Sequence, residues 1–107
     1  MRIPRLAKLT FPLLCLALSP LAQAQNKEAL YTKSLAATCA NCHGTNGKVV
    51  EGSTVTSLAG LDKGYIVAQM NAFKAGTRPA TVMHQISKGF NDAQIESLAG
   101  YFAAQKK

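Results

Sequence analysis

The chain has 107 residues, of which 48% are hydrophobic and 16% charged, and its formal net charge is +7. This length suits one small domain, close to the size at which a protein core alone gives marginal stability. The basic residues are scattered singly and do not alternate with aromatic residues, which argues against nucleic-acid binding. A moderately positive surface instead suits brief, electrostatically guided contact with an acidic partner.

The N-terminus has the pattern of a secretory signal peptide over residues 1–24. Positive side chains precede an apolar stretch too short to span a membrane, and Ala22 and Ala24 form an A-x-A cleavage site. We expect export to the periplasm and a mature domain of residues 25–107 without a membrane span. Three of the 12 Lys and Arg residues lie in the leader, which leaves nine against five Asp and Glu. An uncleaved N-terminal anchor is the alternative.

The first predicted helix of the mature chain covers residues 26–38. Leu30, Ser34 and Leu35 lie on one stripe of it, with Tyr31 beside them. This helix leads directly into the most informative motif of the sequence.

That motif is Cys39-Ala40-Asn41-Cys42-His43, a C-x-x-C-H run typical of c-type haem attachment. Two cysteines three positions apart lie on the same side of one helical turn, so both sulfurs can form thioethers along one edge of a porphyrin. His43 then lies beneath the ring, where a neutral imidazole can bind the iron. We interpret Cys39 and Cys42 as covalent anchors of one haem c and His43 as its proximal axial ligand.

Three other interpretations of these cysteines are weaker. A thioredoxin-type redox pair would lie in a βαβ pattern, which the sequence lacks. A structural zinc site needs about four ligands, and outside the leader only His84 could join the three motif residues. A disulfide would suit an exported protein, but the histidine that follows the pair argues for haem.

Residues 44–60, which follow the motif, are rich in Gly, Ser and Thr. This composition predicts an irregular loop that lines the edge of the ring. We expect Val49, Val50, Val55 and Leu58 to turn inward from the loop. A short strand at Val49 and Val50 is the alternative.

The second long helix begins after Asp62, a good N-cap, and is expected to stop at Gly76. Ile66, Met70 and Phe73 recur at helical spacing along it and form one buried face.

The segment 77–82 is predicted to be extended, because Arg78 precedes Pro79 and is disfavoured in a helical conformation. Met83 follows this strap, and an extended strap can place a thioether against the iron with few helical constraints. We therefore expect Met83 to be the second axial ligand. Arg78 could hydrogen-bond a haem propionate because a guanidinium matches carboxylate geometry, or it could hold the loop or face solvent.

Two other side chains could occupy the sixth position of the iron. Met70 lies on the apolar stripe of its helix and is better explained as a core residue. His84 is better explained as a histidine at the rim. A thioether ligand favours ferrous iron, and a filled sixth position leaves one-electron transfer as the natural function. If Met83 were not bound, an open, gas-binding or catalytic haem would be the alternative.

The last helix has the clearest start signals of the sequence. Asn91 is its N-cap and Gln94 stands at the third helical position, which is a capping-box pattern. Phe90, before the cap, can pack on Ile95. Gly100 lowers local helix stability and suggests close approach by another helix.

The arrangement of these segments resembles the class I c-type cytochromes over nearly the whole mature chain. A more specific resemblance, to the cytochrome subunit of flavocytochrome c sulfide dehydrogenase, rests on residues 58–61, 65–70, 73–76, 78–83, 86–90 and 95–102. It implies an all-α class I cytochrome c fold with three to four helices around one covalently bound haem c. It also places Met83 on the axial methionine of the family. The sequence contains a single haem motif, unlike two-haem members.

The same resemblance implies a partner, an FAD-containing flavoprotein that oxidises sulfide and passes electrons to this haem, and a further redox acceptor. A free periplasmic cytochrome shuttle that feeds a terminal oxidase or another reductase is the alternative. A permanent subunit should carry an apolar patch at the haem edge, and a shuttle should carry a rim of lysines. The chain shows no paired carboxylates and no nucleophile–base set, so we expect an electron-transfer protein and not an enzyme.

Overall fold

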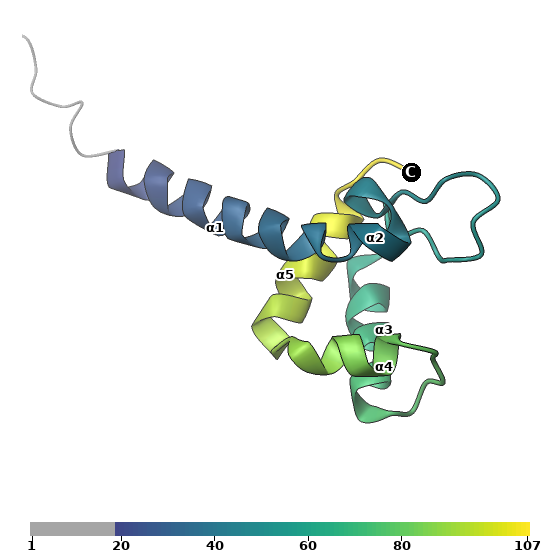
Figure 1. Cartoon of the computed structure of the whole chain (residues 1–107). Helices are drawn as coiled ribbons and strands as arrows, with labels where there is room; N and C mark the ends of the chain where they lie inside the picture. The colour runs from purple at the N-terminus through teal and green to yellow at the C-terminus, as the bar shows by residue number, and fades with distance from the viewer. Residues whose placement is uncertain (1–18) are drawn as a thin grey trace, which may run out of the picture.

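The computed structural model describes residues 19–107, so most of the predicted signal peptide lies outside the described residues. The elements are α1 (Ser19–Ala37), α2 (Ala40–His43), η1 (Thr45–Gly47), α3 (Lys63–Ala75), α4 (Met83–Ile86), η2 (Ser87–Gly89) and α5 (Asp92–Ala103). No strand occurs among residues 19–107, and the expected all-α fold is confirmed (Figure 1). Within this range, no helix is both long and apolar enough to cross a membrane.

Helix α1 begins earlier than predicted and extends away from the other helices at its N-terminal end (Figure 1). Its predicted stripe does not pack as a whole, because Leu30 is 64% exposed and Ser34 is also exposed. Instead, Ala36 is buried and Leu35 is partly buried at the place where α1 contacts α5. The hydroxyl of Tyr31 accepts a hydrogen bond from Gln94 Nε2 at 2.8 Å, which joins the two helices again.

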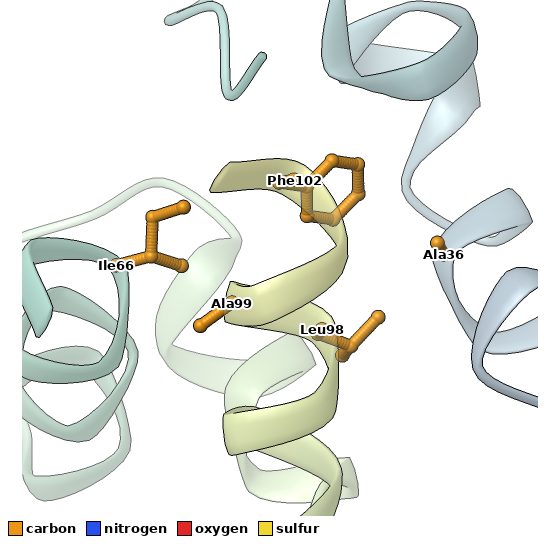
Figure 2. Packing of buried hydrophobic residues seen from close by; sticks show 5 residues of the cluster. All are labelled: Ala36, Ile66, Leu98, Ala99 and Phe102. Atoms are coloured by element: carbon orange, nitrogen blue, oxygen red, sulfur yellow. The ribbon is translucent and has the colours of Figure 1, made fainter. Parts of the chain in front are cut away.

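The core lies along α5, which passes between α1 and α3 (Figure 2). Ala99 points from α5 towards Ile66 of α3, and Leu98 points towards Ala36 of α1. Phe102 completes the cluster and is 2% exposed. The terminal helices therefore pack on each other, through residues that keep helical spacing on α5.

The ends of α3 follow the sequence signals. The Asp62 carboxylate accepts a hydrogen bond from the Tyr65 N–H at 2.8 Å, which satisfies a free amide of the first turn. The helix stops at Gly76, which has a left-handed conformation with φ 76°. On the expected face, Ile66 is buried and Met70 is partly buried against the core.

Helix α5 begins with the predicted capping box. Asn91 Oδ1 accepts from the Gln94 N–H at 2.8 Å, and Gln94 Oε1 accepts from the Asn91 N–H at 2.9 Å. The expectation for Gly100 was wrong: a Cβ there would lie 3.9 Å from Cε of Lys63, an ordinary contact with a flexible side chain. The closest packing of α5 falls one residue earlier, at Ala99, which is fully buried.

The loop 44–60 is irregular as predicted, apart from the single turn η1. Val49 and Val50 do not form a strand, and Val50 points outward with 78% of its surface exposed. Val55 and Leu58 do line the internal cavity described below. The loop and the strap 77–82 lie on the same side of the molecule (Figure 1).

Candidate haem-binding site

A cavity of about 470 Å³ lies between α3, the strap 77–82 and the second half of the loop 44–60. Leu98 and Phe102 of α5 contribute to its lining, together with apolar residues of α3 such as Ile66 and Phe73. A largely apolar cavity of this size is within the range of small-molecule and cofactor sites. The packed helices thus form one wall of the cavity, and the two irregular segments form the other.

The three residues of the C-x-x-C-H motif that would bind haem, Cys39, Cys42 and His43, all line this cavity. The Cys39 N–H donates to the Ala36 carbonyl, and the His43 N–H donates to the Cys39 carbonyl at 2.9 Å, so a helical turn links α1 to α2. Cys39 is partly buried and Cys42 is exposed. Burial raises the pKa of the Cys39 thiol, and its contact with the Thr38 hydroxyl offsets this only in part. The two thiols therefore flank the cavity from one turn, as the spacing predicts.

The imidazole of His43 is held by the loop 44–60. Its Nδ1 lies 2.7 Å from the carbonyl oxygen of Thr56. A carbonyl can only accept, so Nδ1 donates the hydrogen bond, and in the neutral imidazole Nε2 then keeps its lone pair. This is the tautomer and orientation that a metal-ligating histidine needs.

The loop that supplies the Thr56 carbonyl is held by three hydrogen bonds, which all end at one acceptor, the Gly47 carbonyl oxygen. It accepts from the Ser57 hydroxyl at 2.9 Å, the Leu58 N–H at 2.7 Å and the Ala59 N–H at 3.1 Å. Sequence reasoning missed Thr56 and Ser57. A backbone carbonyl and a loop serine have no periodic signature, so only the composition of the segment was visible.

Met83 and Met70 both line the cavity, whereas the side chain of His84 does not. Met83 is the first residue of the single turn α4, so its thioether is presented by a helical start and not by the end of an extended strap. His84 Nδ1 is buried without a hydrogen-bond partner. The thioethers of Met70 and Met83 therefore share the cavity with the His43 imidazole, and either could bind a haem iron there.

Arg78 lies in the wall of the cavity. Its guanidinium donates to Oε1 of Gln69 and stacks over the Phe73 ring at 4.6 Å from the centroid. The stacked, hydrogen-bonded geometry holds the cation at one place, and a guanidinium has further N–H donors for a carboxylate.

Within residues 19–107, no three His, Cys, Asp or Glu side chains converge to hold a bare metal ion. The donor set of the cavity is instead two thiols, an imidazole and thioethers around an apolar volume. That set fits a covalently held iron porphyrin.

Comparison with known proteins agrees with this chemistry. Residues 28–106 match the family described as Cytochrome c. The chain is 37% identical over 73 residues to the "Cytochrome subunit of sulfide dehydrogenase" of Chlorobaculum tepidum, covering 68% of this chain and 64% of that protein. It is 31% identical over 93 residues to the "Thiosulfate dehydrogenase electron acceptor" of Stutzerimonas stutzeri, covering 83% of this chain and 43% of that protein.

A solved cytochrome c4 of Acidithiobacillus ferrooxidans is similar in structure, with a TM-score of 0.61 and 32% sequence identity. The match covers 78% of this chain and 50% of that one. The chain thus spans less than two thirds of the length of each of these relatives.

The chain belongs to the cytochrome c family. It is a class I c-type cytochrome, and proteins of this family carry electrons and bind haem c covalently. The cavity, the placement of Cys39 and Cys42 beside it, and the fixed tautomer of His43 fit that cofactor.

Proposed function

We propose that this chain holds one haem c through thioethers to Cys39 and Cys42, with His43 and Met83 as axial ligands of the iron. The observation that carries the proposal is that one apolar cavity is lined by all four side chains. When bound, the haem supplies a one-electron redox centre.

The residues of the chain have distinct roles in this proposal. The Thr56 carbonyl orients the His43 imidazole and increases its basicity. Met83 would supply a thioether ligand to the iron, and its soft sulfur would favour the ferrous state. Arg78, held by Gln69, would bind a propionate carboxylate at the wall of the cavity.

Replacing Met83 by Ala tests the axial assignment. We expect loss of the absorption band that arises from methionine bound to ferric haem, and a lower reduction potential. Carbon monoxide should then bind to the ferrous variant but not to the unmodified protein.

Met70→Ala is the matched control, because it removes the same side chain from the same cavity. His84→Ala controls for the neighbouring residue, which does not line the cavity. Both controls should keep the methionine band. Loss of the band in Met70→Ala with retention in Met83→Ala would move the ligand to α3, and carbon monoxide binding by the unmodified protein would indicate an open haem.

We further propose that the chain is exported, is cleaved after Ala24 and works in the periplasm as the haem subunit of a flavin-dependent sulfide dehydrogenase. The similarity to a sulfide dehydrogenase subunit supports this role. The lining of the cavity, which includes Val55, Tyr65, Val82 and Ile86, contains no lysine. A haem edge without a rim of lysines favours a stable partner over brief electrostatic contact with an acidic one.

Affinity purification of the tagged chain from its native source tests the partner. We expect an FAD-containing protein in the eluate, and we expect Ile86→Glu to lose it while keeping the haem spectrum. Val50→Glu is the matched control, since Val50 is exposed but lies away from the cavity. Isolation of the unmodified chain without flavin would favour the free shuttle. The mass of the periplasmic product reports both the cleavage site and the number of haems.

A further inference from the structure

We infer that Ser57 is a positioning residue for the axial histidine, acting through the Thr56 carbonyl; this rests on the proposed binding of haem by His43. The imidazole of His43 has one hydrogen bond, from Nδ1 to the Thr56 oxygen at 2.7 Å. The strength of that bond sets how much electron density the imidazole can give to iron. Whatever holds the Thr56 carbonyl therefore tunes the ligand.

Packing does not hold this carbonyl in place. Thr54, Val55 and Thr56 are all exposed, and the loop has no strand or helix at this point. Exposed irregular segments open with little free energy unless hydrogen bonds tie them down. Before Thr56 the hydrogen bonds stay within the exposed loop, from the Ser53 N–H to the Val50 carbonyl and from the Val55 N–H to the Ser53 hydroxyl. The hydrogen bonds that tie this part of the loop to buried Gly47 come from the residues that follow Thr56.

Ser57 supplies that restraint with its side chain. The carbonyl of Thr56 belongs to the peptide group that joins it to Ser57, so the position of the Ser57 backbone sets the direction of the carbonyl. The Ser57 hydroxyl donates to the Gly47 carbonyl at 2.9 Å, and Ser57 is half-buried. Among the three donors to that carbonyl, it is the side-chain donor, the other two being backbone amides.

The acceptor end of this bond is rigid. Gly47 is buried with φ 77°, and a Cβ at this position would lie 2.7 Å from Cδ1 of Phe102. The Gly60 N–H also donates to the Phe102 carbonyl at 2.9 Å. The Ser57 hydroxyl therefore connects the histidine-orienting carbonyl to the packed end of α5.

The test compares Ser57→Ala, Ser57→Thr and Ser53→Ala in the haem-loaded protein. Ser53→Ala is the matched control, because it removes a hydroxyl from the same loop that accepts from the Val55 N–H and does not contact Gly47. Two quantities are measured: the reduction potential, and the rate at which the His43 ring N–H exchanges with solvent in the reduced protein by NMR.

For Ser57→Ala we expect roughly tenfold faster exchange of the ring proton. A looser carbonyl makes the imidazole a poorer donor to ferric iron, so the ferrous form should be favoured by about threefold, or about 30 mV at ~59 mV per tenfold for one electron. Ser57→Thr, which keeps a hydroxyl, and Ser53→Ala should match the unmodified protein in both measurements.

Equal behaviour of Ser57→Ala and Ser53→Ala would overturn the inference while leaving the haem assignment intact. Equal shifts in Ser57→Ala and Ser57→Thr would also overturn it, since the hydroxyl would then not be the cause. Failure of the unmodified chain to carry haem would overturn the proposed function and this inference together.

Discussion

The two walls of the cavity are held in different ways. The wall formed by α3 and α5 rests on buried side chains such as Ile66, Leu98 and Phe102, and both helices begin with side-chain caps. The wall formed by the loop 44–60 and the strap 77–82 is largely exposed and is closed by a few hydrogen bonds around Gly47. Stability thus resides in the first wall, while the residues proposed to tune the iron lie on the second. We therefore expect substitutions in the second wall to change the haem ligands more than they change the stability of the fold.

The largest effect should follow from removing the two cysteines that would anchor the haem. In Cys39→Ala/Cys42→Ala the haem would not be held covalently, and the apolar lining of the cavity of about 470 Å³ would be left open to water. A domain of this size has only marginal stability to offset such a loss. We expect this variant to lack most of its helical circular dichroism, whereas Met83→Ala should keep it. A fully helical haem-free chain would show that the helical wall is sufficient by itself.

Within the helical wall, Leu98→Ala should lower the free energy of unfolding by about 2–5 kcal/mol, because Leu98 is 3% exposed in the core. Leu30→Ala is the matched change on α1, where the side chain is 64% exposed, and should change it by less than about 0.5 kcal/mol. Denaturant unfolding of the haem-loaded protein measures both. Similar losses would mean that the projecting part of α1 packs against something in solution.

In the loop wall, alanine substitutions at two glycines distinguish the cost of backbone strain from the cost of a steric overlap. Gly47 and Gly52 both have left-handed backbones, with φ 77° and 83°, but no atom lies within 4 Å of a Cβ at Gly52. Gly52→Ala should therefore cost about 1–2 kcal/mol for the backbone alone. Gly47→Ala should cost about 1–3 kcal/mol more, because its methyl group would overlap Phe102. Equal costs from thermal unfolding would mean that α5 does not hold this loop.

The smallest predicted effect is an increase in the free energy of unfolding. Gly100→Ala removes a glycine from the interior of α5 at a site where a methyl group makes only an ordinary contact with the Lys63 side chain. The helix should become more stable by about 0.5–1 kcal/mol, with an unchanged reduction potential. If this variant were less stable than the unmodified protein, the result would support the close helix approach at Gly100 that the sequence predicts.

Features encoded within a few neighbouring residues were predictable from the sequence. The haem motif, the Asp62 and Asn91 caps and the stop at Gly76 depend on local spacing and backbone preference, so their chemistry is visible without a fold. The irregular character of the loop 44–60 followed from its composition in the same way. The assignment of Met83 stays a prediction, although the cavity brings it into the same space as the motif.

Contacts between distant segments required the tertiary structure. The hydrogen bond from His43 to Thr56 and the bond from Ser57 to Gly47 each join residues ten or more positions apart, and one partner of each is a backbone carbonyl that no residue type identifies. The outward turn of Val50 was equally invisible, because hydrophobicity alone does not decide which loop valines find a neighbour. Local free energies define the helices and the motif, but only the packing of the whole chain decides which carbonyl meets the imidazole.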